Sequence, residues 1–127
     1  MSKQIYLGKE FLEGFCCQFW MDPEAGGSHF RFPVNNDPYA HCVIAGALDS
    51  WWRTVGHLIH ECHEFALTAQ GLRFRSSSYM SEQGSDATVF VCTHDQLGET
   101  HMAVGGAMAT ILPKLSTEWK KARKARK

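Results

Sequence analysis

The feature that most constrains this chain is residues 51–70, where apolar side chains recur with helical spacing. Twenty residues in a helix span about 30 Å, enough to cross a small domain. Asp49 or Ser50 is suited to cap the start of this helix, and Gly71 is suited to end it. At about 100° per residue, one apolar stripe is formed by Trp51, Val55, Leu58, Ile59, Cys62, Ala66 and Ala69.

The opposite side of the predicted helix is polar and rich in potential metal ligands. His57, His60 and Glu64 fall together there, and Glu61 stands next to them. His60 and Glu64 are four residues apart, so on a helix both side chains can reach one ion. This face is therefore the first candidate for a functional site.

The rest of the chain alternates short apolar runs with turn formers, which predicts a small sheet. Residues 4–20 resemble a hairpin or meander punctuated by Gly8 and Gly14. A polar loop is expected over 76–86. Further short strands are predicted at 29–32, 41–48, 72–75 and 88–92, the last of them buried.

A second helix is predicted over about 94–112. Thr93 and Gln96 match a capping box, and Pro113 is expected to end the helix. His101 falls on its apolar stripe, which favours a core position. That stripe consists of Leu97, Val104, Met108 and Ile111. The helix also contains small residues that would let another backbone approach closely, namely Gly98, Ala103, Gly105, Gly106 and Ala107.

These elements predict an α+β fold, with a small sheet packed on a central long helix at about 50–70 and a second helix crossing it. Residues 1–119 are expected to form one domain, and 120–127 a disordered basic tail. The tail holds six of the thirteen basic residues, so the remaining residues carry a formal charge of −6. Its cations, which suit a weak contact with nucleic acid or another anion, are Lys120, Lys121, Arg123, Lys124, Arg126 and Lys127.

No apolar run reaches the length of a membrane span, and no signal-peptide core begins the chain, so a cytoplasmic protein without membrane contact is expected. The five cysteines contain no CxxC pair, which favours reduced, mostly buried thiols. Cys62 lies on the apolar stripe, so a buried, unreactive thiol is expected there.

The segment His60-Glu61-Cys62-His63-Glu64 resembles the His-Glu-x-x-His helix of zincin-type metallohydrolases, with glutamate in place of the second histidine. The order of elements over about 41–112 is similar to a minimal zincin, and the chain also resembles small zincin-like proteins encoded by bacteriophages. The resemblance implies that His60 and Glu64 bind zinc and that Glu61 acts as general base on a peptide or protein substrate.

A zinc site of this kind needs a third ligand. His94 is the first choice, because it lies where a predicted strand meets a helix. With His60 and Glu64 it would form a His₂Glu set. Glu99 and His57 are the alternates, and a set of one histidine and two glutamates would also admit iron or manganese.

Two classes of function are therefore open. The first is a small zincin-like metal-binding protein that hydrolyses amide bonds with zinc. The second is a non-enzymatic accessory protein, of the phage-encoded kind, that binds a macromolecular partner through its acidic body or its basic tail.

Overall fold

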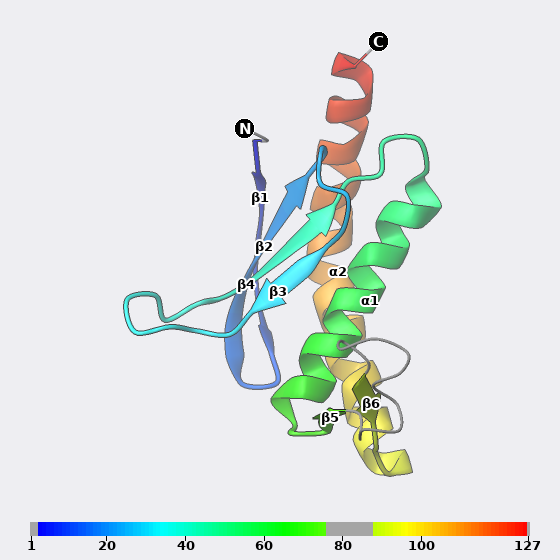
Figure 1. Cartoon of the computed structure of the whole chain (residues 1–127). Helices are drawn as coiled ribbons and strands as arrows, with labels where there is room; N and C mark the ends of the chain where they lie inside the picture. Colours follow the sequence, from blue (N-terminus) through cyan, green and yellow to red (C-terminus); the bar gives the residue numbers. More distant parts are fainter. Residues whose placement is uncertain (1–2, 76–87, 127) are drawn as a thin grey trace.

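The protein, described here over residues 3–75 and 88–126 by a computed structural model, has an α+β fold. A four-stranded mixed sheet carries two long helices on one face, and the helices lie side by side (Figure 1). The predicted fold class is confirmed.

The sheet begins with a hairpin of β1 (Ile5–Leu12) and β2 (Phe15–Asp22), as predicted. The two residues of its turn both have positive φ, 52° at Glu13 and 83° at Gly14. Such a turn matches the right-handed twist of the flanking strands, and glycine accepts this conformation without steric cost.

Two further strands complete the sheet in the order β1-β2-β4-β3. β4 (Ala40–Ala45) pairs in parallel with β2, and β3 (His29–Arg31) pairs antiparallel with β4 at the edge. Alternate residues of β2 are buried beneath the helices, and these are Cys17, Phe19 and Met21.

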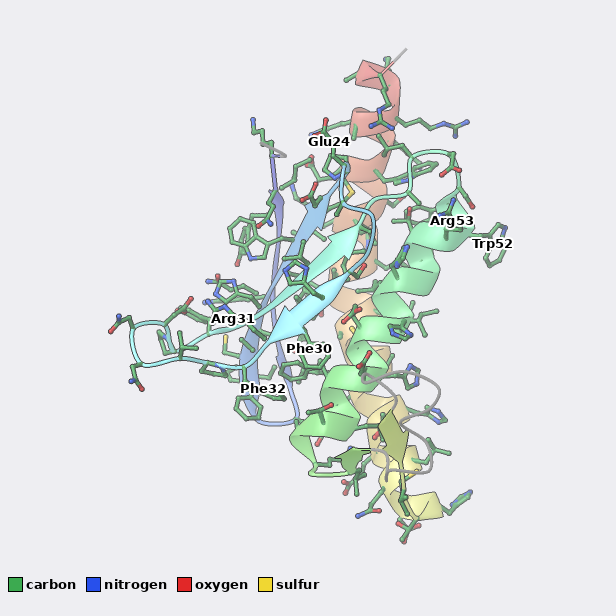
Figure 2. The ribbon with its side chains drawn as sticks, viewed as in Figure 1. Glu24, Phe30, Arg31, Phe32, Trp52 and Arg53 are labelled. Carbon is green, nitrogen blue, oxygen red and sulfur yellow. The ribbon has the colours of Figure 1, made fainter. Side chains whose placement is uncertain are left out.

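The long helix α1 (Trp51–Ala69) begins and ends as predicted. The Ser50 hydroxyl accepts a hydrogen bond from the Arg53 N–H, and Gly71 follows the helix with a φ of 75°. Figure 2 shows Arg53 and the exposed Trp52 at its first turns.

The buried side of α1 is rotated relative to the predicted stripe. Val55 and Ile59 are only partly buried, whereas Phe65 is 1% exposed. The cause is an aromatic cluster, in which the Phe65 ring stacks on Phe32 at a centroid distance of 4.7 Å. Phe15 and Phe30 complete this cluster, and Figure 2 shows Phe30 and Phe32 beside α1. The buried residues of α1 are Thr54, Leu58, Glu61, Cys62, Phe65 and Ala66.

The second helix, α2 (His94–Ala125), starts at the predicted capping box but is much longer than predicted. The expectation that Pro113 ends the helix is wrong, because α2 continues for twelve residues beyond it. Proline in a helix interior removes a hydrogen bond and costs about 3 kcal/mol, so packing must offset it. Leu115 and Trp119 supply that packing, at 0% and 5% exposure.

The Trp119 side chain holds the final turns of α2 against the rest of the fold. Its indole N–H donates to the Ala47 carbonyl at 3.1 Å, and its ring lies 5.2 Å from that of Trp51. Residues 120–125, predicted as part of a disordered tail, are therefore helical, and these turns extend beyond the sheet (Figure 1).

Two further expectations for α2 are wrong. His101, predicted to be in the core, is exposed. No other backbone packs closely against Gly98, Gly105 or Gly106, since a Cβ added at any of them would have no neighbour within 4 Å. The stripe residues Val104 and Ile111 are buried as predicted, whereas Leu97 is 37% exposed.

A two-stranded ribbon of β5 (Arg73–Arg75) and β6 (Thr88–Phe90) joins the helices. Val91 and Cys92, predicted to belong to a buried strand, follow β6 and are exposed. The polar loop predicted over 76–86 lies outside the described residues. Neither α1 nor α2 is long and apolar enough to cross a membrane, nor is any other helix in the described ranges.

All five cysteines are free thiols. Cys17, Cys42 and Cys62 are buried as predicted, and Cys92 is exposed. Burial, with a smaller effect of the nearby Cys62 and Cys16 sulfurs, raises the pKa of Cys17 to about 12.

Candidate metal centre

The polar face of α1 brings two of the predicted ligands into direct contact. His60 Nε2 lies 3.0 Å from Glu64 Oε2, the distance of an ion pair or charge-assisted hydrogen bond. The His60 side chain is 69% exposed and that of Glu64 23% exposed. Helical spacing accounts for this pair, because residues four apart share a face.

Glu61 joins this pair. One ligand atom from each of His60, Glu61 and Glu64 can be chosen so that all three lie within 4.8 Å of one another. Glu61 is only 5% exposed, so the group runs from an exposed imidazole to a carboxylate at the edge of the core. The rotation of α1 that buries Phe65 also turns Glu61 inward.

The negative charge of Glu61 affects the pKa of two buried thiols, Cys62 and Cys42. Burial raises the pKa of Cys62 to about 12, and the negative charge of Glu61 adds to the shift. Burial also raises the pKa of the Cys42 thiol in β4, with smaller contributions from Cys62, Cys17 and Glu61. The carboxylate therefore lies at the boundary between α1 and β4.

A shallow depression of about 470 Å³ opens in front of this group. His60 and Glu61 lie on its wall, and His57 and Arg53 extend it toward the start of α1. A second hollow of about 430 Å³ shares His57 and Arg53 and continues to Arg126 at the end of α2. Ser28, which precedes β3, completes the lining of the first depression, so the edge of the sheet borders the candidate site.

The structure does not bring His94 into this group. The helices run antiparallel, because Trp51 lies beside Trp119 at one end and Gln70 donates to Thr100 at the other. His94 begins α2 beyond Thr100, whereas His60 lies further up α1. His60 lies ten residues before Gln70 and His94 six residues before Thr100, so a rise of 1.5 Å per residue separates their levels by roughly 24 Å. Within the described parts of the chain, no group of three potential ligands includes His94.

The two alternates are also outside the group. Glu99 faces the β1–β2 turn, where its charge, after burial, raises the pKa of Glu13. His57 lines the same depression as His60 but is not among the three converging residues. Glu61, predicted as the general base, thus takes the place of His94 as the third potential ligand.

The donor chemistry suits a divalent cation. One imidazole nitrogen and two carboxylate groups form a set that accepts zinc, manganese or iron(II). The open side of the depression leaves room for water or substrate. Without a cation, the His60–Glu64 contact is an i,i+4 pair on the helix surface, which with a protonated imidazole contributes about 0.3–0.5 kcal/mol to stability.

The predicted anion-binding residues lie on the last turns of α2. Lys120, Lys121, Arg123, Lys124 and Arg126 are all exposed, and Lys127 lies outside the described residues. The Arg123 guanidinium lies over the Trp119 ring at 5.2 Å, and Lys121 pairs with Glu118 at 3.5 Å.

Comparison with known protein families, curated proteins and solved structures finds no match for this chain.

Proposed function

We propose that this protein binds one divalent cation through His60, Glu61 and Glu64 and uses it to hydrolyse amide bonds. The observation that carries the proposal is the convergence of three ligand atoms within 4.8 Å, two of whose residues, His60 and Glu61, line an open depression. The same three residues form the part of the chain that resembles the zincin motif.

Each residue has a distinct part in the proposed reaction. His60 and Glu64, on one helical face, hold the cation from the solvent side, and Glu61 closes the set from the core side. A bound divalent cation supplies Lewis acidity toward a carbonyl and makes water more acidic. One carboxylate oxygen of Glu61 would face the cation, and the other would accept the proton that the attacking water loses and pass it to the departing amine.

The edge of the sheet supports an extended peptide as substrate. β3 pairs with β4 on one side only, and the described part of the chain places no strand on its other side. Such an edge offers unpaired backbone groups to an added strand. Ser28, just before β3, lines the depression, so a peptide laid along β3 would pass the proposed cation.

Metal analysis of the purified protein tests the proposal. We expect about one equivalent of zinc or manganese to be lost in the double variant His60→Ala/Glu64→Ala. His57→Ala is the matched control, because His57 lies in the same depression and on the same helix but outside the group. If the double variant retains as much metal as the control, the site does not exist.

Hydrolysis is measured separately, with a mixture of internally quenched peptides. Cleavage should require added metal and disappear in the double variant but persist in His57→Ala. Metal binding without any cleavage would keep the metal site and remove the assignment as an enzyme.

The second candidate function is non-enzymatic binding of an anionic macromolecule, and one observation favours it. The basic residues at the end of α2 are presented on a helix that extends beyond the sheet, rather than on a disordered tail (Figure 1). Lys120→Glu/Lys124→Glu should abolish such binding to single-stranded nucleic acid without altering metal content. Equal binding by the variant and the wild type would remove this candidate.

A reducing compartment, the cytoplasm, is the location we propose. The support is the set of five free thiols, three of them enclosed in the core.

A further inference from the structure

A pair of imidazoles lies where α1 meets α2. The rings of His63 and His101 have centroids 5.4 Å apart and planes at 84°. His63 and Glu61 are two residues apart, which is about 200° around a helix, so the pair lies on the flank of α1 that faces away from Glu61. His63 is half-buried and His101 exposed, so solvent reaches the pair.

The His63 ring is held in a defined tautomer. Its Nδ1 lies 3.0 Å from the Ile59 carbonyl oxygen. A carbonyl only accepts, so Nδ1 carries the proton of the neutral ring and Nε2 carries the lone pair. Metal-binding histidines are usually oriented in this way, with one ring nitrogen donating to a carbonyl or carboxylate.

The separation of the rings suits two ligands of one ion. A metal–nitrogen bond of about 2.1 Å places a ring centroid about 3.2 Å from the metal. At a tetrahedral angle, two such centroids are then about 5 Å apart. The observed 5.4 Å is close to this value, and rotation of the two side chains would bring one nitrogen of each ring to the ion.

We propose that His63 and His101 form a second metal site, for Zn²⁺, Ni²⁺ or Cu²⁺, that joins α1 to α2. Imidazole suits all three ions, and water completes the coordination. The ligands come from different helices, so the bound ion cross-links them. An ion that binds only the folded state also raises the unfolding temperature, and the rise increases with the ratio of ion concentration to the dissociation constant.

Binding of Ni²⁺ in the variant His60→Ala/Glu64→Ala tests this second site alone, because two of the three ligands of the first site are removed there. Calorimetry should give about one equivalent in this background. Adding His101→Gln should weaken the affinity at least tenfold and remove the rise in unfolding temperature that Ni²⁺ causes. His94→Gln is the matched control, an exposed histidine seven residues away on the same helix, and should change neither.

Electron paramagnetic resonance of bound Cu²⁺ reports the number of nitrogen ligands, which would not change if His63 and His101 had only a structural role. In the same background, the spectrum should show two nitrogen ligands, and one after His101→Gln or His63→Gln. The proposal is overturned if the His101→Gln protein binds Ni²⁺ as tightly as its parent, or if His94→Gln weakens binding equally. Neither outcome bears on the His60–Glu61–Glu64 site, which lacks two of its three ligands in all of these proteins.

Discussion

Leu115→Ala is the substitution that most directly tests the course of α2 beyond Pro113. Leu115 is fully buried and lies between the buried Ile111 and Trp119 on one face of the helix. Truncation of a buried leucine to alanine removes apolar contacts and leaves a cavity, at a cost of 2–5 kcal/mol. With Leu115 at 0% exposure, we expect a loss of about 3 kcal/mol in the free energy of unfolding.

Urea denaturation followed by circular dichroism measures this loss, with the dependence on urea unchanged. For a chain of this length, the unfolding temperature should fall by about 10 °C. Leu97→Ala is the matched control, the same substitution in the same helix at a residue 37% exposed. It should cost less than about 1 kcal/mol.

The two variants would behave alike if residues beyond Pro113 were a frayed tail. Equal free energies of unfolding for Leu115→Ala and Leu97→Ala would therefore refute the continuous helix. The position of Arg126 in the second hollow would be refuted with it, because that residue is carried by the last turn of α2.

Three further predictions concern single side chains. Hydrogen bonds from the Tyr39 N–H and Arg31, and a smaller one from His41, lower the pKa of Asp37 to about 2. Its contribution to stability is complete above its unfolded value of about 4 and disappears as the pH falls toward 2, so Asp37→Asn should flatten acid unfolding over that range. Ellman's reagent at pH 8 should modify Cys92 rapidly, whereas Cys62, whose pKa is raised to about 12, should react only as fast as the protein unfolds. Glu61→Gln should keep metal affinity within about tenfold but lower the rate of peptide hydrolysis at least about 100-fold. The reason is that an amide oxygen can bind a metal ion but does not accept a proton. An unchanged rate would exclude Glu61 as the base.

Local patterns predict most of the elements of this fold. The 3.6-residue period, the serine cap and the glycine stop locate α1, and the capping box locates the start of α2. Turn formers and short apolar runs predict the hairpin and β3. Each of these signals lies within a few residues of the element that it specifies, which is why the sequence alone suffices.

The end of α2 depends on tertiary structure, and there local rules mislead. Pro113 is a helix breaker in isolation, but Leu115 and Trp119 lie against distant parts of the chain and offset its cost. The residues after Trp119 are lysine, arginine and alanine, which are strong helix formers once a helix precedes them. Cations in the last turn also interact favourably with the helix dipole. A basic composition alone does not distinguish this helix end from a disordered tail.

In the candidate site, too, one part is predictable from local sequence and another depends on tertiary packing. Spacing predicts the His60–Glu64 pair, which the structure confirms at 3.0 Å. The third position is not predictable from spacing, since it depends on where β4 and α2 lie around α1. Glu61 turns toward the core because Phe65, four residues on, enters a cluster with three phenylalanines from the sheet side. His94 is excluded because the two helices are antiparallel and it lies beyond the end of their contact.

The rotation of α1 therefore determines what each of its polar residues faces. Phe65 in its aromatic cluster fixes the inner side, so Glu61 is directed to the β4 flank and His63 to the α2 flank. His60 and Glu64 stay on the outer side. A rotation of α1 by one residue, about 100°, would bury an imidazole or carry Glu61 away from β4, and neither group of potential ligands would remain together. Both proposed metal sites thus follow from the packing of one apolar side chain that belongs to neither.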